Sequence, residues 1–162
     1  MTAMTRVLLV DDEREFTAIM SQRLIRRNYS VIRACSGRDA LTRLEQNDDI
    51  DVVILDVKMP ELDGVETLKL IKKKWPLVEV LMLTAHSTID SAISAIKLGA
   101  IDYMMKPIEM DQLVIKIDKA AGRKRHREKL IQDVYATPYL TRHEREEKIA
   151  EILKDDMKGR GA

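Results

Sequence analysis

The sequence has little of what several protein classes depend on. Among its 162 residues there is a single cysteine, Cys35, which excludes an internal disulfide and a zinc site made of cysteines. The longest uncharged stretch, residues 80–89, has ten residues, whereas a membrane-spanning helix needs ~20. Residues 1–12 reach two acids before any apolar stretch of signal-peptide length. We therefore expect a cytoplasmic protein without membrane contact.

Neither sign of charge dominates the sequence. Lys and Arg number 28 and Asp and Glu 27, so the net charge of +1 predicts no general affinity for nucleic acid or anionic membranes. The 45% of hydrophobic and 34% of charged residues suit a globular protein with a core. The charge is unevenly distributed, because residues 1–122 hold 17 basic and 19 acidic side chains and residues 123–162 hold 11 and 8. The C-terminal quarter is therefore a distinct, basic segment.

Strand-like and helix-like patterns alternate along the first three quarters of the chain. Short apolar runs typical of strands lie at Arg6–Val10, Val31–Ala34, Val52–Leu55, Val78–Leu83 and Tyr103–Met105. Apolar residues at helical spacing predict helices at Glu13–Arg27, Arg38–Gln46, Val65–Lys74 and Ala92–Leu98. Five such units predict an α/β protein with a parallel sheet. We expect a flavodoxin-like three-layer sandwich with strand order 2-1-3-4-5 and a C-terminal helical tail.

Polar residues come directly after four of these strands. Asp11 and Asp12 follow the first strand, and Asp56 follows the third. Thr84 follows the fourth strand, and Lys106 follows the fifth. The carboxyl ends of parallel strands share one edge of the sheet, so we expect these side chains to lie together. Three close carboxylates repel one another unless a cation intervenes, and all-oxygen ligation suits Mg²⁺. The pattern predicts a magnesium site, where Lys106 pairs with Asp56 or an incoming anion.

This set of residues suits phosphoryl transfer to a carboxylate. Asp56 is the best candidate for the nucleophile because it follows the most buried strand, and Asp11 and Asp12 suit metal binding. Thr84 and Lys106 would neutralise phosphoryl oxygens. Each residue alone also has an ordinary interpretation, as a helix cap for Asp11 and Asp12 and as a turn residue for Asp56 and Thr84, while Lys106 before Pro107 means little by itself. Their joint placement at one edge favours the functional interpretation.

Four motifs, in this order, carry a resemblance to a known family. LLVDDE, VVILDVKMPELDG, LMLTA and DYMMKP together resemble the receiver domain of two-component response regulators, over residues 6–121. The resemblance implies that Asp56 accepts a phosphoryl group from a histidine kinase or phosphotransfer protein. It implies that Asp12, Asp56 and the Lys58 backbone carbonyl bind Mg²⁺, with Asp11 acting through metal-bound water. It further implies that the protein is no enzyme beyond its own phosphorylation and dephosphorylation.

The same resemblance implies a phosphorylation-driven switch. Thr84 takes the place of the switch hydroxyl, Tyr103 that of the rotating aromatic, and Lys106 that of the phosphate-pairing lysine, with a cis peptide bond to Pro107. The surface of the fourth helix, fifth strand and fifth helix would then change shape for a partner to read. The resemblance also marks three positions that tune the dephosphorylation rate: Lys58, Ala85 and His86.

The chain changes character after residue 121. Apolar spacing predicts a fifth helix that continues past the receiver until Pro138. Thr141 and Glu144 form a capping box before a last helix. The basic run Arg123–Lys129 lacks interleaved aromatics, so we interpret it as a solvated helix face and consider nucleic-acid binding unlikely. One face of the last helix is apolar, with Ile149, Ile152, Leu153 and Met157.

We divide the chain into a receiver domain at residues 1–121 and a helical extension at residues 122–162. The extension is too short for a familiar output domain, so the chain resembles a stand-alone receiver. Its apolar face predicts that the last helix packs on its own domain or on a second copy. The expected homodimer would use the fifth helix and the C-terminal helix.

Three other functions compete with this one. An aspartate-nucleophile phosphatase needs a second Asp two residues after the first, where this sequence has Lys58. A flavin-binding protein needs a first loop that attracts phosphate, whereas residues 11–13 are all acidic. A DNA-associated transcriptional regulator acting through the basic tail remains the alternative.

Overall fold

The computed structural model describes residues 4–85 and 89–154. Eleven elements follow in chain order: β1 (Arg6–Val10), α1 (Arg14–Ile25), β2 (Ser30–Ala34), α2 (Gly37–Gln46), β3 (Val52–Asp56), α3 (Gly64–Lys74), β4 (Glu79–Thr84), α4 (Ile89–Lys97), β5 (Asp102–Met105), α5 (Met110–Ala136) and α6 (Arg142–Lys154). The strands form one sheet in the order β2-β1-β3-β4-β5, and all neighbouring pairs are parallel. The predicted fold class and strand order are therefore confirmed.

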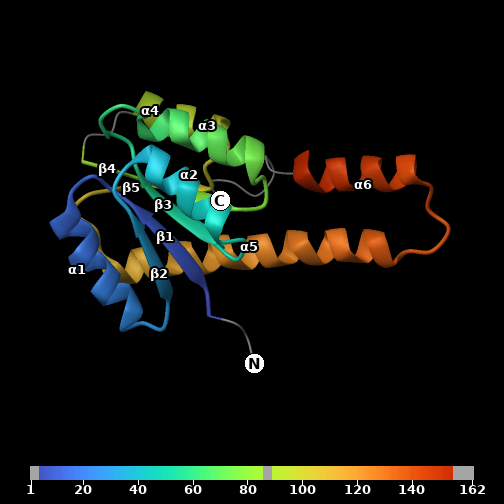
Figure 1. Ribbon diagram of the computed structural model, residues 1–162, viewed down its shortest axis with the longest axis horizontal. Helices are drawn as coiled ribbons and strands as arrows, with labels where there is room; N and C mark the ends of the chain where they lie inside the picture. The colour runs from blue at the N-terminus through green and yellow to red at the C-terminus, as the bar shows by residue number, and fades with distance from the viewer. Residues whose placement is uncertain (1–3, 86–88, 155–162) are drawn as a thin grey trace.

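Helices cover both faces of the sheet (Figure 1). Leu8, Val53 and Met82 face α2, α3 and α4 in one core cluster, while Leu9 and Ile54 face α1 and α5 in the other. Every residue of the inner strands β3 and β4 is buried. That burial on both sides explains why their sequences are continuous apolar runs rather than alternating ones.

Side-chain caps fix where two of the helices begin. The Ser36 hydroxyl accepts a hydrogen bond from the Asp39 N–H at the start of α2, and the Asp63 carboxylate accepts one from the Glu66 N–H at the start of α3. Gly99 has φ +114° just after α4, a conformation that favours glycine. These local signals place the loops at both edges of the sheet.

The C-terminal extension is a helical hairpin. The 27-residue helix α5 continues beyond the sheet, and α6 returns alongside its distal half (Figure 1). The predicted capping box is present: the Thr141 N–H donates to Glu144 Oε2 at 2.8 Å and the Glu144 N–H donates to Thr141 Oγ1 at 3.1 Å. Ile149, Ile152 and Leu153 are half-buried, and Met157 lies outside the described residues. The predicted boundary between residues 121 and 122 lies inside α5.

Three basic residues of α5 turn back onto the amino-terminal edge of the sheet. Lys124 Nζ lies 3.1 Å from Asp51 Oδ1, and Arg127 Nη1 lies 2.9 Å from Glu79 Oε1. Arg123 also contacts Glu79, at 3.3 Å. Glu79 is fully buried and Lys124 and Arg127 nearly so. We call these five residues the amino-edge cluster.

The amino-edge cluster corrects one sequence interpretation. The run Arg123–Lys129 is not simply a solvated helix face, because Lys124 and Arg127 are drawn inward by two acids. Only the rest of the run, including Arg125 and Lys129, is exposed or half-exposed. Within the described part of the chain, no helix has the length and apolar character needed to cross a membrane.

Candidate functional site

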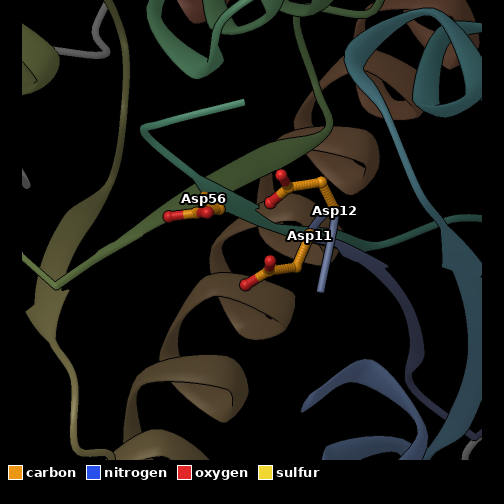
Figure 2. A group of neighbouring side chains, drawn as sticks. All are labelled: Asp11, Asp12 and Asp56. Atoms are coloured by element: carbon orange, nitrogen blue, oxygen red, sulfur yellow. The ribbon is translucent and has the colours of Figure 1, made fainter. Parts of the chain in front are cut away.

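The carboxyl edge of the sheet brings the predicted acids together. Asp11 and Asp12 follow β1 and Asp56 ends β3, and Figure 2 shows their carboxylates on one side of these strand ends. One oxygen from each carboxylate lies within 4.8 Å of the other two. Asp11 and Asp56 are buried, whereas Asp12 is exposed. The geometry is thus a half-open acidic cluster with one carboxylate facing solvent.

Backbone contacts hold the two loops that carry these acids. The Asp11 N–H donates to the Ala34 carbonyl, and Asp11 Oδ1 accepts a hydrogen bond from the Glu13 N–H at 2.9 Å. The Gly64 N–H donates to the Val57 carbonyl at 2.9 Å, closing the loop after β3. The backbone passes so close there that a Cβ on Gly64 would lie 2.1 Å from the Asp56 carbonyl oxygen. Glycine is therefore required for the loop to pack against the strand end.

Lys106 enters the cluster from the end of β5. Its Nζ lies 2.7 Å from Asp11 Oδ2 and 4.0 Å from Asp56 Oδ2. Pairing with Asp56 was one expectation, but the shorter contact is with Asp11. The ammonium also lies 4.3 Å from the centre of the Phe16 ring. The peptide bond from Lys106 to Pro107 is cis, as predicted.

The charges in the cluster shift two pKa values. Burial, followed by the negative charge of Asp11, raises the pKa of Asp56 from 3.8 to about 6, although Lys106 opposes the shift. Burial alone would lower the pKa of Lys106, but its hydrogen bond to Asp11 and the nearby negative charges outweigh burial and raise it. Lys106 therefore stays charged, while the Asp56 carboxylate holds its proton more tightly than an exposed aspartate does.

The residues present fit a hard divalent cation. Three carboxylates offer only oxygen donors. The raised pKa of Asp56 comes first from burial and then from the negative charge of Asp11, and a bound cation would offset both effects. A cavity of about 440 Å³ opens beside Asp12 and is lined by Lys58, Met59 and Asp63 among others. Lys58 is exposed at its rim. The site thus has solvent access for an ion.

Thr84 and Tyr103 lie on the neighbouring strands. Thr84 ends β4 and is buried, and its carbonyl accepts a hydrogen bond from the Lys106 N–H at 2.8 Å. Tyr103 packs against the core cluster that α4 covers, and its hydroxyl is buried without a hydrogen-bond partner among the described residues. Ala85 is exposed next to Thr84. His86 lies outside the described residues.

Sequence reasoning missed two features of this structure. Phe16 contacts Lys106, whereas the pattern that predicts the helix at Glu13–Arg27 counts it only as an apolar position; its place one turn after Asp12 is the available signal for a contact at the site. The second is the partner of the basic run. Glu79 is an acid inside an apolar strand run, and such a buried acid needs a cation.

Comparisons with known proteins agree with this geometry. Residues 7–118 match the model of the response regulator receiver domain. The chain is 40% identical over 114 residues to the transcriptional regulatory protein ZraR of Escherichia coli (strain K12), covering 70% of this chain and 26% of ZraR. It is 33% identical over 114 residues to the DNA-binding transcriptional regulator NtrC of Proteus hauseri, covering 70% and 24%. The chain spans about a quarter of the length of these curated relatives.

Solved structures show the same relationship. A response regulator receiver domain protein from Clostridium thermocellum superposes with a TM-score of 0.72 at 37% identity, covering 75% of this chain and 98% of that one. A beryllofluoride-activated NtrC4 receiver domain, described as a dimer, superposes with a TM-score of 0.70 at 34% identity, covering 75% and 99%. The fold and acidic site define a two-component signalling domain. The chain belongs to the response regulator receiver domain family.

Proposed function

We propose that this chain is a phosphorylation-activated switch whose phosphoacceptor is Asp56. The observation that carries the proposal is the acidic cluster of Asp11, Asp12 and Asp56 with the Lys106 ammonium beside it. The donor would be a phosphohistidine on a histidine kinase or phosphotransfer protein. Asp12, Asp56 and the Lys58 backbone carbonyl would hold Mg²⁺ directly, and Asp11 would do so through water. When bound, Mg²⁺ supplies charge neutralisation for the carboxylates and the phosphoryl oxygens.

The protein's own residues divide the transfer between them. A carboxylate oxygen of Asp56 forms the new bond to phosphorus as the bond from phosphorus to the histidine nitrogen breaks, and its electron pair stays on that nitrogen. The Lys106 ammonium and the Thr84 hydroxyl bind phosphoryl oxygens. Water later cleaves the acyl phosphate, releasing phosphate and restoring the carboxylate. We expect Lys58, Ala85 and His86 to set the lifetime of the acyl phosphate. We also expect the protein to turn over no external substrate.

The switch would be read on the surface of α4, β5 and α5. Thr84 moves toward the phosphoryl group, and Tyr103 follows into the space beside it. Exposed apolar side chains support a docking role for this surface, since Ile93, Met105 and Ile115 are 47%, 54% and 61% exposed. Phosphorylation shifts an existing equilibrium between two shapes of the surface.

Labelling with a small phosphodonor tests the proposal. The full chain is incubated with acetyl phosphate and Mg²⁺, and intact mass is recorded before and after mild alkali, which hydrolyses an acyl phosphate. We expect one alkali-labile phosphoryl group on the wild type and none on Asp56→Asn. Asp48→Asn, at an exposed carboxylate outside the cluster, is the matched control and should be labelled normally. An unlabelled wild type, or a labelled Asp56→Asn, contradicts the proposal.

The names of the relatives raise a second role, in transcription. ZraR and NtrC are named as transcriptional regulators, but each is about four times as long as the matched segment. In this chain Lys124 and Arg127 are engaged by buried acids, which leaves less basic charge for DNA. We therefore rank protein contacts first. Salt-sensitive binding of the phosphorylated chain to duplex DNA, measured by fluorescence anisotropy, would reverse this ranking.

A further inference from the structure

Phe16 lies in the first turn of α1 and is the single phenylalanine of the chain. The rest of its ring packs against the core cluster under α1 and α5. One ring face meets the Lys106 ammonium, with 4.3 Å between Nζ and the ring centre. An aromatic face attracts a cation at this distance through its quadrupole.

Within the part of the chain that the structure describes, two carboxylates and an aromatic ring lie close to the ammonium. Asp11 Oδ2 lies at 2.7 Å, Asp56 Oδ2 at 4.0 Å and the Phe16 ring at 4.3 Å. The Lys106 side chain is 15% exposed, although the preceding Met105 is 54% exposed at the edge of the sheet. The lysine thus leaves an open edge strand, and its side chain is largely enclosed. Asp11, Asp56 and Phe16 form that enclosure.

A lysine needs such an enclosure because its stem is flexible. Its four-carbon stem and rotating ammonium impose no direction of their own. Its hydrogen bond to Asp11 at 2.7 Å draws the ammonium toward Asp11 and away from Asp56, which lies at 4.0 Å. A ring face adds a wall that favours the cation without offering a competing negative charge.

We propose that Phe16 is a positioning residue for phosphoryl transfer, because its ring holds the Lys106 ammonium within reach of the phosphoryl oxygens on Asp56. The inference rests on the proposed function. Phe16 itself touches neither donor nor acceptor atoms and acts through Lys106. A purely packing role would require only an apolar side chain of similar size, so leucine and phenylalanine would then be equivalent at this position.

The test compares Phe16→Leu with Phe16→Tyr in the full chain. The rate of labelling by acetyl phosphate at saturating Mg²⁺ is the readout. We expect Phe16→Leu to slow labelling by about threefold to tenfold, the range of a partly buried cation–ring contact, and Phe16→Tyr to restore it to within about twofold. Met20→Leu, a core substitution one turn further along α1, is the packing control and should label at the wild-type rate.

Two further measurements separate positioning from packing. In a Lys106→Met background, Phe16→Leu should slow labelling no further, because the ring then has no cation to hold. In the wild type, NMR should show the Lys106 ε-methylene protons shifted upfield by the ring, and Phe16→Leu should remove that shift.

Each outcome decides between the alternatives. A folded Phe16→Leu that labels at the wild-type rate overturns the inference, as does an equal slowing in the Lys106→Met background. If Phe16→Leu fails to fold, the upfield shift in the wild type decides: its presence supports the contact and its absence overturns it. If the wild type itself takes up no phosphoryl group, the proposed function fails, and the inference fails with it even where the shift shows the contact.

Discussion

Asp56 has two opposing demands placed on its single carboxyl group. As the proposed phosphoacceptor it must be ionised, yet burial and the charge of Asp11 raise its pKa to about 6. The pKa is higher in the folded than in the unfolded chain, so folding favours the protonated form. The resulting stabilisation is fully present below about pH 4 and is lost as the pH rises through 6. Two pKa units correspond to about 3 kcal/mol.

We expect Asp56→Asn to raise the melting temperature of the metal-free protein at pH 7.5, because it removes an ionised carboxylate from the acidic cluster. The difference from the wild type should shrink on lowering the pH and disappear near pH 4. Thermal unfolding in the presence of a chelator, followed by circular dichroism, measures this. Asp48→Asn should show no such pH dependence, and a stabilisation by Asp56→Asn that is equal at both pH values would contradict the prediction.

Adding Mg²⁺ should raise the melting temperature of the wild type above that of Asp56→Asn. A ligand that binds only the folded state stabilises it by RT ln(1 + [L]/Kd), so a tighter ligand stabilises more at the same concentration. We expect Mg²⁺ to raise the melting temperature of the wild type at pH 7.5 and to do so much less for Asp56→Asn or Asp12→Asn. Equal shifts in all three proteins would place the ion elsewhere.

The residues of the site were predictable from the sequence, but their mutual contacts were not. Asp56, Thr84 and Lys106 stand out because each closes an apolar strand run, and parallel strands end at one edge. That Lys106 pairs more closely with Asp11 than with Asp56 depends on side-chain angles. The contact with Phe16 depends on them equally, and no spacing rule encodes such angles.

Helix α5 is anchored at the edge of the sheet opposite the acidic site. Its Lys124 and Arg127 pair with Asp51, just before β3, and with Glu79, the first residue of β4. The partners are 73 and 48 residues apart in the chain. Apolar spacing therefore predicted the helix correctly. The partners of its charged face could not be predicted from that spacing, because they lie far away in the chain. A buried acid in the β4 run was the one local indication.

Breaking one of these buried pairs should destabilise the fold. We expect Arg127→Met to lower the free energy of unfolding by about 3 kcal/mol or more, because Glu79 loses its nearest cation in a buried setting. Adding Glu79→Gln should recover part of the loss, since the unpaired charge is then removed. Urea unfolding measures all three proteins. Lys129→Met, on the exposed part of the same run, should change stability little, and an equal effect there would contradict the prediction.

The whole molecule is a receiver with a helical hairpin projecting from it (Figure 1). Within the described residues of α6 none is buried, and Leu130 on α5 is 37% exposed. Between the two helices lies a cleft of about 950 Å³ that includes Leu130, Val134 and Ile152. The apolar side chains of α5 and α6 that line this cleft, which we call the seam, are therefore partly open to solvent. We propose that a second copy covers it, through α5 and α6.

Light scattering after size-exclusion chromatography tests the dimer. We expect a dimer of the full chain, strengthened by beryllofluoride and Mg²⁺, and a monomer for Leu130→Glu, which puts a charge into the seam. Lys129→Glu, its neighbour on the helix, is the matched control and should leave the dimer intact. A wild-type monomer under both conditions contradicts the proposal.

Shortening the chain at two points should have unequal effects. A chain that ends at residue 122 lacks Lys124 and Arg127 and leaves Glu79 buried without its partners. A chain that ends at residue 137 keeps the amino-edge cluster and loses only the α6 arm. We expect a large fall in melting temperature for the first and a small one for the second. Equal stability would mean that the cluster contributes nothing.

The amino-edge cluster also bears on how such modules can be recombined. A hybrid that joins a foreign effector at the end of the family match would discard the basic half of α5 and remove the cations that pair with Asp51 and Glu79 at the amino-terminal edge of the sheet. A graft placed after residue 136 would carry those cations along. The safe junction for engineering therefore lies about five helical turns beyond the end of the family match.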